Sequence, residues 1–122
     1  MSKSIIQKGR YCFLSGEYAD FLHKHHIFGG GLRNWSEKEG LWVYLLPEEH
    51  MKLHITPETE QNLKRVGQFM YEKYHSREEF MRKVRKNYLT IPLSDEEIKK
   101  FGLVEYEPYN IADDDIERIL GK

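Results

Sequence analysis

The chain has 122 residues, one cysteine and a formal net charge of −1 at pH 7, and this length fits a single domain with a modest hydrophobic core. No stretch approaches the about 20 consecutive apolar residues that cross a bilayer, and the opening residues "MSKSIIQKGR" lack the apolar core of a secretory signal. Cys12 alone cannot form an intrachain disulfide, which favours a reducing compartment. The composition therefore favours a cytoplasmic protein with no membrane partner.

The small net charge conceals an asymmetry along the chain. Residues 1–93 carry 15 Lys and Arg against 11 Asp and Glu, whereas residues 94–122 carry 4 against 9. A basic body suits a polyanionic partner such as nucleic acid, although ordinary solvated faces give the same balance. The change of sign divides the chain into a domain over residues 1–93 and an acidic helical extension over residues 94–122.

The first half of the chain has the patterns of strands and turns. Short extended pieces are predicted at residues 5–6 and 11–16, and a strand is predicted at residues 22–28, where three glycines end it in a flexible loop. The stretch "GLWVYLL", residues 40–46, is aromatic and β-branched and gives the strongest strand signal. A proline then favours the start of a short helix over residues 47–54.

The second half of the chain has the signals of helices. Thr56 and Pro57 begin one helix, and serine–glutamate capping boxes begin two more at Ser76 and Ser94. A final short helix is predicted over residues 112–121, with aspartates near its positive end. Apolar residues recur at helical spacing: Leu63, Val66, Met70 and Tyr74, then Phe80, Val84 and Tyr88, then Ile98 and Phe101. The predicted fold class is therefore α+β.

Histidines are concentrated in two short stretches. The first, "LHKHHIFGGG" at residues 22–31, holds three of the six histidines. Adjacent residues of a strand point to opposite sides, so His25 and His26 cannot easily do the same job. His50 and His54 stand four apart, which on a helix places both rings on one face. One strand histidine can join His50 and His54 on a divalent ion, while the other accepts a proton from water.

The pattern "LHKHHIFGG…SEKEGLWVYLLPEEH", continuing through "REEF…NYL", resembles the HNH endonucleases of the His-Me finger (ββα-metal) group, in particular a small phage-type branch. The resemblance covers residues 5–54 and reaches about Leu89. It implies a ββα-metal core with additional C-terminal helices. It also implies a metal-dependent endonuclease that hydrolyses DNA phosphodiester bonds with a histidine general base and a single divalent metal ion (Mg, Mn, Ni or Zn). In this match, the general base is His26 and the metal ligands are His25, His50 and His54.

The chain departs from the family pattern at three places, one of which is the short segment between His50 and His54. Many relatives have two pairs of thiolates that bind a structural zinc, whereas here only Cys12 remains. Because structural zinc needs a closed set of four ligands, no structural zinc is expected. The asparagine that braces the family's central loop has no clean match, and Asn34 is the candidate substitute.

Basic side chains near the histidines are candidates for binding nucleic acid. Lys24, Arg33 and Lys52 lie close to the two histidine stretches in sequence. A second group interleaves with apolar positions in "FMRKVRKNY", where a helix could lie along a duplex backbone, and consists of Arg82, Lys83, Arg85 and Lys86. For both groups, solvated surface charges are the alternative.

Several other residues are given no functional role. His23 and His75 match no position of the family pattern, and Trp42 and Tyr44 are interpreted as hairpin packing. Trp35, beside the glycines, is either a packing residue or a residue that stacks on a base.

Three functions stay open from the sequence. The first is the DNA endonuclease, encoded by a phage or prophage and acting inside a bacterial host. The second is a catalytically inactive HNH-fold nucleic-acid-binding or regulatory phage protein, which the missing thiolates and asparagine leave open. The third is a structural or interaction protein that binds no metal. The sequence does not fix the oligomeric state.

Overall fold

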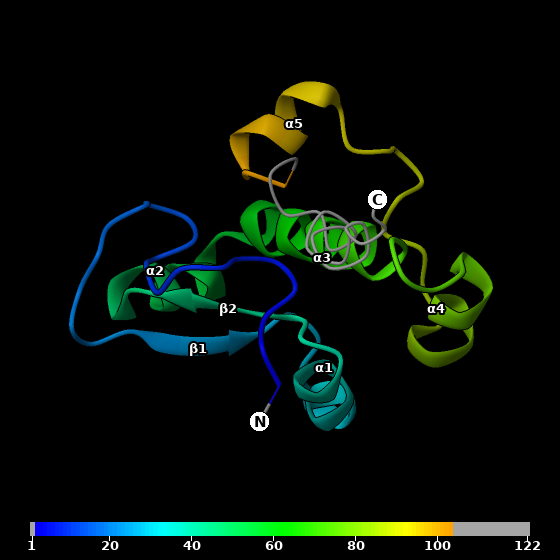
Figure 1. Ribbon diagram of the computed structural model, residues 1–122, viewed down its shortest axis with the longest axis horizontal. Coiled ribbons are helices and arrows are strands. Elements are labelled where there is room, and N and C mark those ends of the chain that lie inside the picture. Colours follow the sequence, from blue (N-terminus) through cyan, green and yellow to red (C-terminus); the bar gives the residue numbers. More distant parts are fainter. Residues whose placement is uncertain (1, 104–122) are drawn as a thin grey trace, which may run out of the picture.

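The computed structural model describes residues 2–103, and within them the chain folds as α+β, with a two-stranded antiparallel sheet and several helices (Figure 1). The elements follow in the order β1 (His23–His26), η1 (Gly30–Leu32), α1 (Arg33–Lys38), β2 (Trp42–Leu45), α2 (Pro47–Lys52), η2 (Leu53–Ile55), α3 (Pro57–Tyr71), α4 (Arg77–Val84) and α5 (Asp95–Lys100), where η denotes a 3-10 turn. The α+β class expected from the sequence is confirmed. The helix predicted over residues 112–121 lies outside the described residues.

The register of the sheet distributes the side chains of β1 over two faces. His25 lies opposite Val43, and His26 lies opposite Trp42. Because side chains alternate along a strand, the two neighbouring histidines point to opposite sides of the sheet. The inner face carries His23, His25, Val43 and Leu45, and the outer face carries Lys24, His26, Trp42 and Tyr44.

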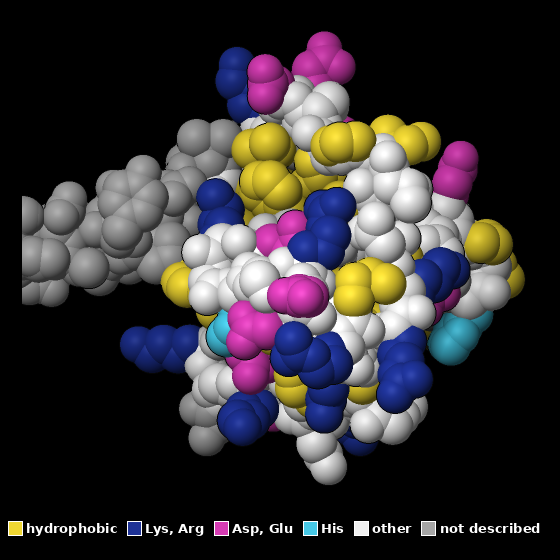
Figure 2. Space-filling view, turned by 90° about the vertical axis from the view of Figure 1, so that its right-hand side faces the viewer, with side chains coloured by type: hydrophobic (Ala, Val, Ile, Leu, Met, Phe, Trp, Pro, Cys, Tyr) yellow, Lys and Arg dark blue, Asp and Glu magenta, His cyan; other side chains and the backbone are white. Residues whose placement is uncertain are grey.

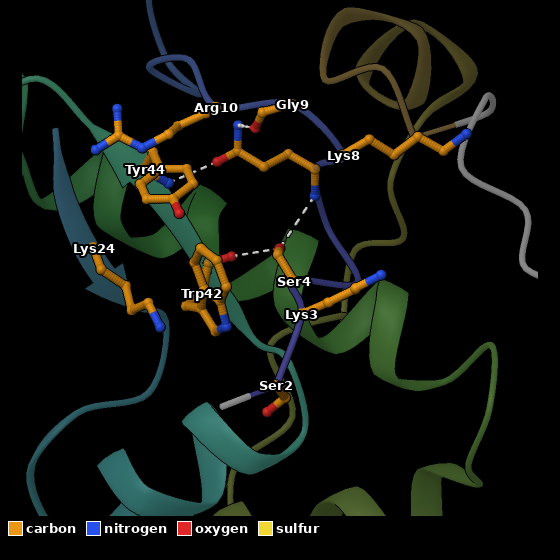
Figure 3. Close-up of a pocket in the computed structure, with 10 residues that line it drawn as sticks. Ser2, Lys3, Ser4, Lys8, Gly9, Arg10, Lys24, Trp42 and Tyr44 are labelled. Atoms are coloured by element: carbon orange, nitrogen blue, oxygen red, sulfur yellow. Dashed lines mark hydrogen bonds between the residues drawn. The ribbon is translucent and has the colours of Figure 1, made fainter. Parts of the chain in front are cut away.

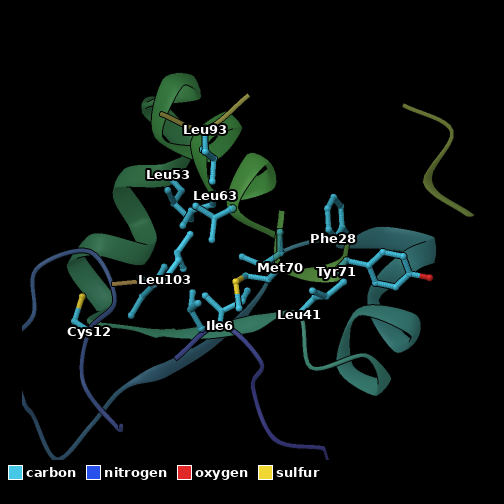
Figure 4. Close-up of a cluster of buried hydrophobic side chains, with 14 of the residues drawn as sticks. Ile6, Cys12, Phe28, Leu41, Leu53, Leu63, Met70, Tyr71, Leu93 and Leu103 are labelled. Carbon is cyan, nitrogen blue, oxygen red and sulfur yellow. The ribbon is translucent and has the colours of Figure 1, made fainter. Parts of the chain in front are cut away.

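The hydrophobic core lies between the inner face of the sheet and α3. Leu63, Val66 and Met70 of α3 are buried, as their spacing predicts, whereas Tyr74, the last residue of that series, lies beyond the end of α3 and is 44% exposed. Figure 4 shows Leu63 and Met70 in one cluster with Ile6 from the N-terminal segment. Cys12 is fully buried at the edge of this cluster, so it acts as a small apolar residue there.

The N-terminal segment, residues 2–22, forms no strand, so both extended pieces predicted there are wrong. The segment follows the edge of β2 that β1 leaves open, where the Phe13 amide donates to the Tyr44 carbonyl at 2.8 Å. The side-chain oxygen of Gln7 accepts from the Tyr44 amide at 2.6 Å. Because a side chain replaces the backbone as acceptor, a regular ladder does not continue from β2.

The loop predicted after the three glycines contains a helix, because η1 and α1 occupy it. Ser36 of α1 is fully buried, and its hydroxyl accepts from the Phe28 amide at 3.2 Å and donates to the Leu41 carbonyl at 2.6 Å. Ser36 therefore braces the connection between β1 and β2. Asn34, the candidate for that role, is exposed on α1.

The helix starts were predicted better than the helix ends. Both capping boxes, at Ser76 and Ser94, are present and confirm the prediction. α4 ends at Val84, because Arg85 adopts a left-handed backbone with φ of 69°, and Tyr88 lies beyond the helix. None of the helices within residues 2–103 combines the length and apolar character needed to cross a membrane.

Gly40 fixes the position of the N-terminal segment against the sheet. Its φ is +75°, and a Cβ at this residue would lie 2.4 Å from the carbonyl oxygen of Lys3. We expect Gly40→Ala to lower the free energy of unfolding by about 3 kcal/mol, because it combines a left-handed backbone with a backbone clash. Denaturation with urea measures this loss.

Gly102→Ala is the matched control for this substitution. Gly102 also has a positive φ, +69°, but its added Cβ would meet no atom of the described residues within 4 Å. A loss of about 1 kcal/mol is expected from the backbone conformation alone. Equal losses in the two variants would show that the contact with Lys3 is unimportant.

Candidate functional site

Three imidazoles from β1 and α2 meet at the inner face of the sheet. The Nδ1 atom of His25 lies 3.3 Å from Nε2 of His50, and the Nδ1 atom of His23 lies 2.9 Å from Nδ1 of His50. His50 therefore links the two histidines of the inner face. The sequence predicted the approach of His25 and His50, but it gave His23 no role.

Two imidazoles of this group, those of His25 and His50, are held neutral near pH 7. Burial, reinforced by the nearby His50, lowers the pKa of His25 to about 4. Burial also lowers the pKa of His50, with further contributions from His23 and His54. A neutral imidazole has one nitrogen lone pair, which is the form that binds a metal ion.

The distance between His25 and His50 fits either of two arrangements. The two nitrogens can share one proton in a hydrogen bond. They can also bind one ion, because two nitrogens that lie 2.0–2.1 Å from a tetrahedral zinc ion are about 3.3 Å apart. The other nitrogen of His25, Nε2, is buried and has no hydrogen-bond partner within residues 2–103.

His54, the third predicted ligand, is not part of this cluster. α2 ends at Lys52, and the chain tightens into the 3-10 turn η2, which carries His54 as an exposed residue. The four-residue spacing aligns two side chains only while an α-helix continues. Within residues 2–103, no group of three or more His, Cys, Asp or Glu side chains is arranged to hold a metal ion. The structure thus brings together two of the three predicted ligands.

His26 forms a separate pair with Glu37 on the outer face of the sheet. Its Nε2 atom lies 2.6 Å from Oε1 of Glu37, and the Arg33 Nε–H donates to its Nδ1 atom at 3.4 Å. Lys24 lies 3.2 Å from both oxygens of the same carboxylate. Hydrogen bonds, first from His26 and then from Lys24, lower the pKa of Glu37.

These contacts define the tautomer of His26. A carboxylate only accepts hydrogen bonds, so the proton of the neutral ring lies on Nε2. The lone pair is then on Nδ1, where Arg33 donates. Glu37 was not identified from the sequence, because it lies on α1, where the sequence predicted a loop.

The remaining basic candidates are exposed side chains on α2, on α4 and directly after α4. Lys52 is exposed on α2 and pairs with Glu49 at 3.4 Å. The group on α4 and the residues after it lies at the end of the molecule opposite α2 (Figure 1). Figure 2, which views the molecule from the α4 side, shows Lys and Arg interspersed with Asp and Glu rather than in a continuous stripe. This group consists of Arg82, Lys83, Arg85 and Lys86, and all four are exposed.

Trp35 is a packing residue in the structure. Its ring contacts those of Phe28, Tyr71 and Phe80, with centroids 5.9, 5.3 and 6.4 Å away. These contacts anchor α1, and with it Glu37, to α3 and α4.

Comparison of the chain with family models, with curated proteins and with solved structures gives no match in any of the three.

The buried imidazole of His25 is expected to make stability depend on pH. The ordinary pKa of histidine is 6.5 and that of His25 is about 4 in the folded protein, so between these values the unfolded chain binds more protons. The contribution of His25 to stability is therefore present above pH 6.5 and is lost as the pH falls toward 4. We expect His25→Asn to remove on the order of 2 kcal/mol of this pH dependence.

Urea denaturation of both proteins between pH 4 and pH 7.5, in the presence of EDTA, measures the difference. The comparison isolates His25, because all other titrating groups are common to the two proteins. If the unfolding free energy of wild type and variant depended on pH in the same way, the lowered pKa of His25 would be contradicted.

Proposed function

We propose that the protein is a metal-dependent endonuclease with a ββα-metal core of HNH type, acting on DNA. One observation carries the proposal: neighbouring residues of β1 supply a neutral imidazole pair, His25 with His50, and a carboxylate-oriented imidazole, His26 with Glu37. The order β1, β2, α2 supports the same core.

His25 and His50 would hold the metal ion in this proposal. Their neutral rings and the 3.3 Å spacing between Nδ1 of His25 and Nε2 of His50 are compatible with this role. His54 is the candidate third ligand, since η2 follows α2 directly. When bound, a divalent ion stabilises negative charge on a phosphate oxygen and on the leaving oxygen.

His26 is the proposed general base. Glu37 fixes the ring by accepting from Nε2, and this leaves the Nδ1 lone pair to take a proton from the attacking water. The carboxylate then stabilises the imidazolium that forms. Arg33, which donates to Nδ1 in the free protein, would move to the phosphate when the substrate binds.

The position of β1 at the edge of the sheet supports access from both sides. In the described residues the sheet contains only β1 and β2, so β1 has one edge without a partner strand. A phosphodiester lying along this edge could contact the inner face and the outer face together. Lys24, Arg33 and Lys52 would bind the flanking phosphates, and the basic residues near α4 would contact DNA farther along.

A second candidate is a catalytically inactive nucleic-acid-binding protein on the same fold. The observation that favours it is the position of His26, which points to the face of the sheet opposite the His25–His50 pair. Both ring nitrogens of His26 are also engaged by neighbours. Metal binding without cleavage would favour this candidate.

Metal binding is tested by isothermal titration with Mn²⁺, Ni²⁺ and Zn²⁺. We expect His25→Ala and His50→Ala each to weaken the binding of at least one of these ions by about tenfold or more, because each removes a ligand. His75→Ala is the matched control, since His75 packs on Tyr71 and pairs with Glu39 away from the site. Unchanged metal affinity in His25→Ala and His50→Ala would exclude the proposed ligands.

Cleavage is tested by the nicking of supercoiled plasmid with each of these ions and with Mg²⁺. We expect His26→Ala to reduce the rate by about 10² to 10⁴-fold, which is the usual contribution of a general base, while metal affinity stays unchanged. Glu37→Gln should reduce the rate less, because it keeps the position of the ring but not the charge. Nicking that survives in His26→Ala would contradict the assigned base. A wild type that binds the metal ion but does not nick the plasmid would favour the inactive binding protein.

A further inference from the structure

A cavity of about 640 Å³ lies on the outer face of the sheet, between β1, β2 and the N-terminal segment (Figure 3). Trp42 and Tyr44 of β2 form part of its wall, and the N-terminal segment closes it from the other side. This volume is typical of sites that bind small molecules. The mechanism proposed above does not use it.

The lining of the cavity combines positive charge with aromatic rings. Ten described residues line it, and four of them are cationic while none is acidic. The guanidinium of Arg10 lies 5.1 Å from the centre of the Tyr44 ring, and the ammonium of Lys24 lies 4.1 Å from the centre of the Trp42 ring. Such a combination is typical of sites for unpaired nucleotides, where bases stack on aromatic rings and cations bind phosphates.

One donor in the cavity wall has no partner among the described residues. The indole nitrogen of Trp42 is buried without a hydrogen bond, and the residue as a whole is 6% exposed. Figure 3 shows this nitrogen directed toward Ser2, which also lines the cavity. An indole N–H can only donate, and a buried donor without an acceptor is unfavourable. This nitrogen is enclosed in the wall of the cavity rather than exposed to its interior.

The wall of the cavity is already ordered by hydrogen bonds. The hydroxyl of Ser4 donates to the Trp42 carbonyl at 2.7 Å. The side-chain amide of Gln7 donates to the carbonyls of Gly9 and Tyr11 at 3.2 and 3.0 Å. A site of this kind binds its ligand without first having to order its own wall.

We propose that this cavity binds one unpaired nucleotide of a nucleic-acid strand. The base packs against Tyr44, the more exposed of the two rings, and the adjoining phosphates bind Lys3 and Arg10. A base that remains paired and stacked in a duplex cannot present its face to Tyr44, so the ligand is a single-stranded or locally opened segment. An acidic peptide would satisfy the charges but would not need an aromatic ring beside them.

Lys24 connects the cavity to the proposed general base. It lines the cavity, and its ammonium lies 3.2 Å from Glu37, which in turn lies 2.6 Å from His26. A strand that leaves the cavity past Lys24 therefore delivers a neighbouring phosphate to His26. This last step rests on the proposed nuclease function, whereas binding of the nucleotide does not.

The test measures the fluorescence anisotropy of a labelled oligothymidylate of eight residues, in EDTA so that cleavage plays no part. Tyr44→Ala is expected to weaken binding by roughly 5- to 100-fold, the usual effect of removing one stacking ring, while Tyr44→Phe keeps most of the affinity. Arg10→Ala should weaken binding and reduce the salt dependence of log K by about 0.7, as expected for one lost phosphate contact.

The matched control for Arg10→Ala is Lys99→Ala, which removes an exposed cation of α5 that does not line the cavity. This variant should bind like the wild type. Arg10 is exposed, so Arg10→Ala tests the cavity even where Tyr44→Ala lowers the melting temperature too far for use.

Several outcomes would overturn the proposal. The first is a duplex of the same length that binds as tightly as the single strand. The second is oligoglutamate that competes as strongly as unlabelled oligothymidylate. The third is thymidine 5′-monophosphate that binds as tightly as the oligonucleotide. Unchanged affinity in both Tyr44→Ala and Arg10→Ala would also overturn it, even with nicking activity intact. Conversely, a wild type that binds the oligonucleotide through these residues but never nicks plasmid supports the cavity and removes only the nuclease.

Discussion

The alternation of side chains along β1 is the constraint on which the rest of the structure depends. Four consecutive polar residues, His23 to His26, occupy a strand that packs on the core. A polar group that leaves water needs a new partner, so each face of β1 must supply its own. The inner face does this with His50 from α2, and the outer face does it with Glu37 from α1. Hydrogen bonds to the side chains of β1 therefore help to fix the positions of both α1 and α2.

The partners of the β1 histidines are chemically different on the two faces. On the inner face, the imidazoles of His23 and His25 both contact that of His50, and burial keeps His25 and His50 neutral. On the outer face, a carboxylate and two cations surround His26. A neutral nitrogen cluster suits a metal ion, whereas a histidine held by a carboxylate suits proton transfer. Two adjacent histidines of identical covalent structure thus acquire different chemical properties from their surroundings alone.

The sequence predicted those parts of the molecule that depend on short-range patterns. Strand alternation separated His25 from His26, and helix caps located the starts of α4 and α5. Residues that act through tertiary contacts were missed: Ser36 and Glu37 lie on a helix that follows glycines, and their partners are distant in sequence. The expectation for His54 depended on a helix that continued to that residue. α2 ends at Lys52, so the spacing no longer places the two rings on one face.

Lys24 couples the cavity of the outer face to the His26–Glu37 pair. Its ammonium is shared between the Glu37 carboxylate and the face of the Trp42 ring. A phosphate bound at the cavity would attract this ammonium and weaken its contact with Glu37. The carboxylate would then keep its hydrogen bond with His26 while losing its closest cation. The position of Lys24 therefore links the contents of the cavity to the charge around the His26–Glu37 pair.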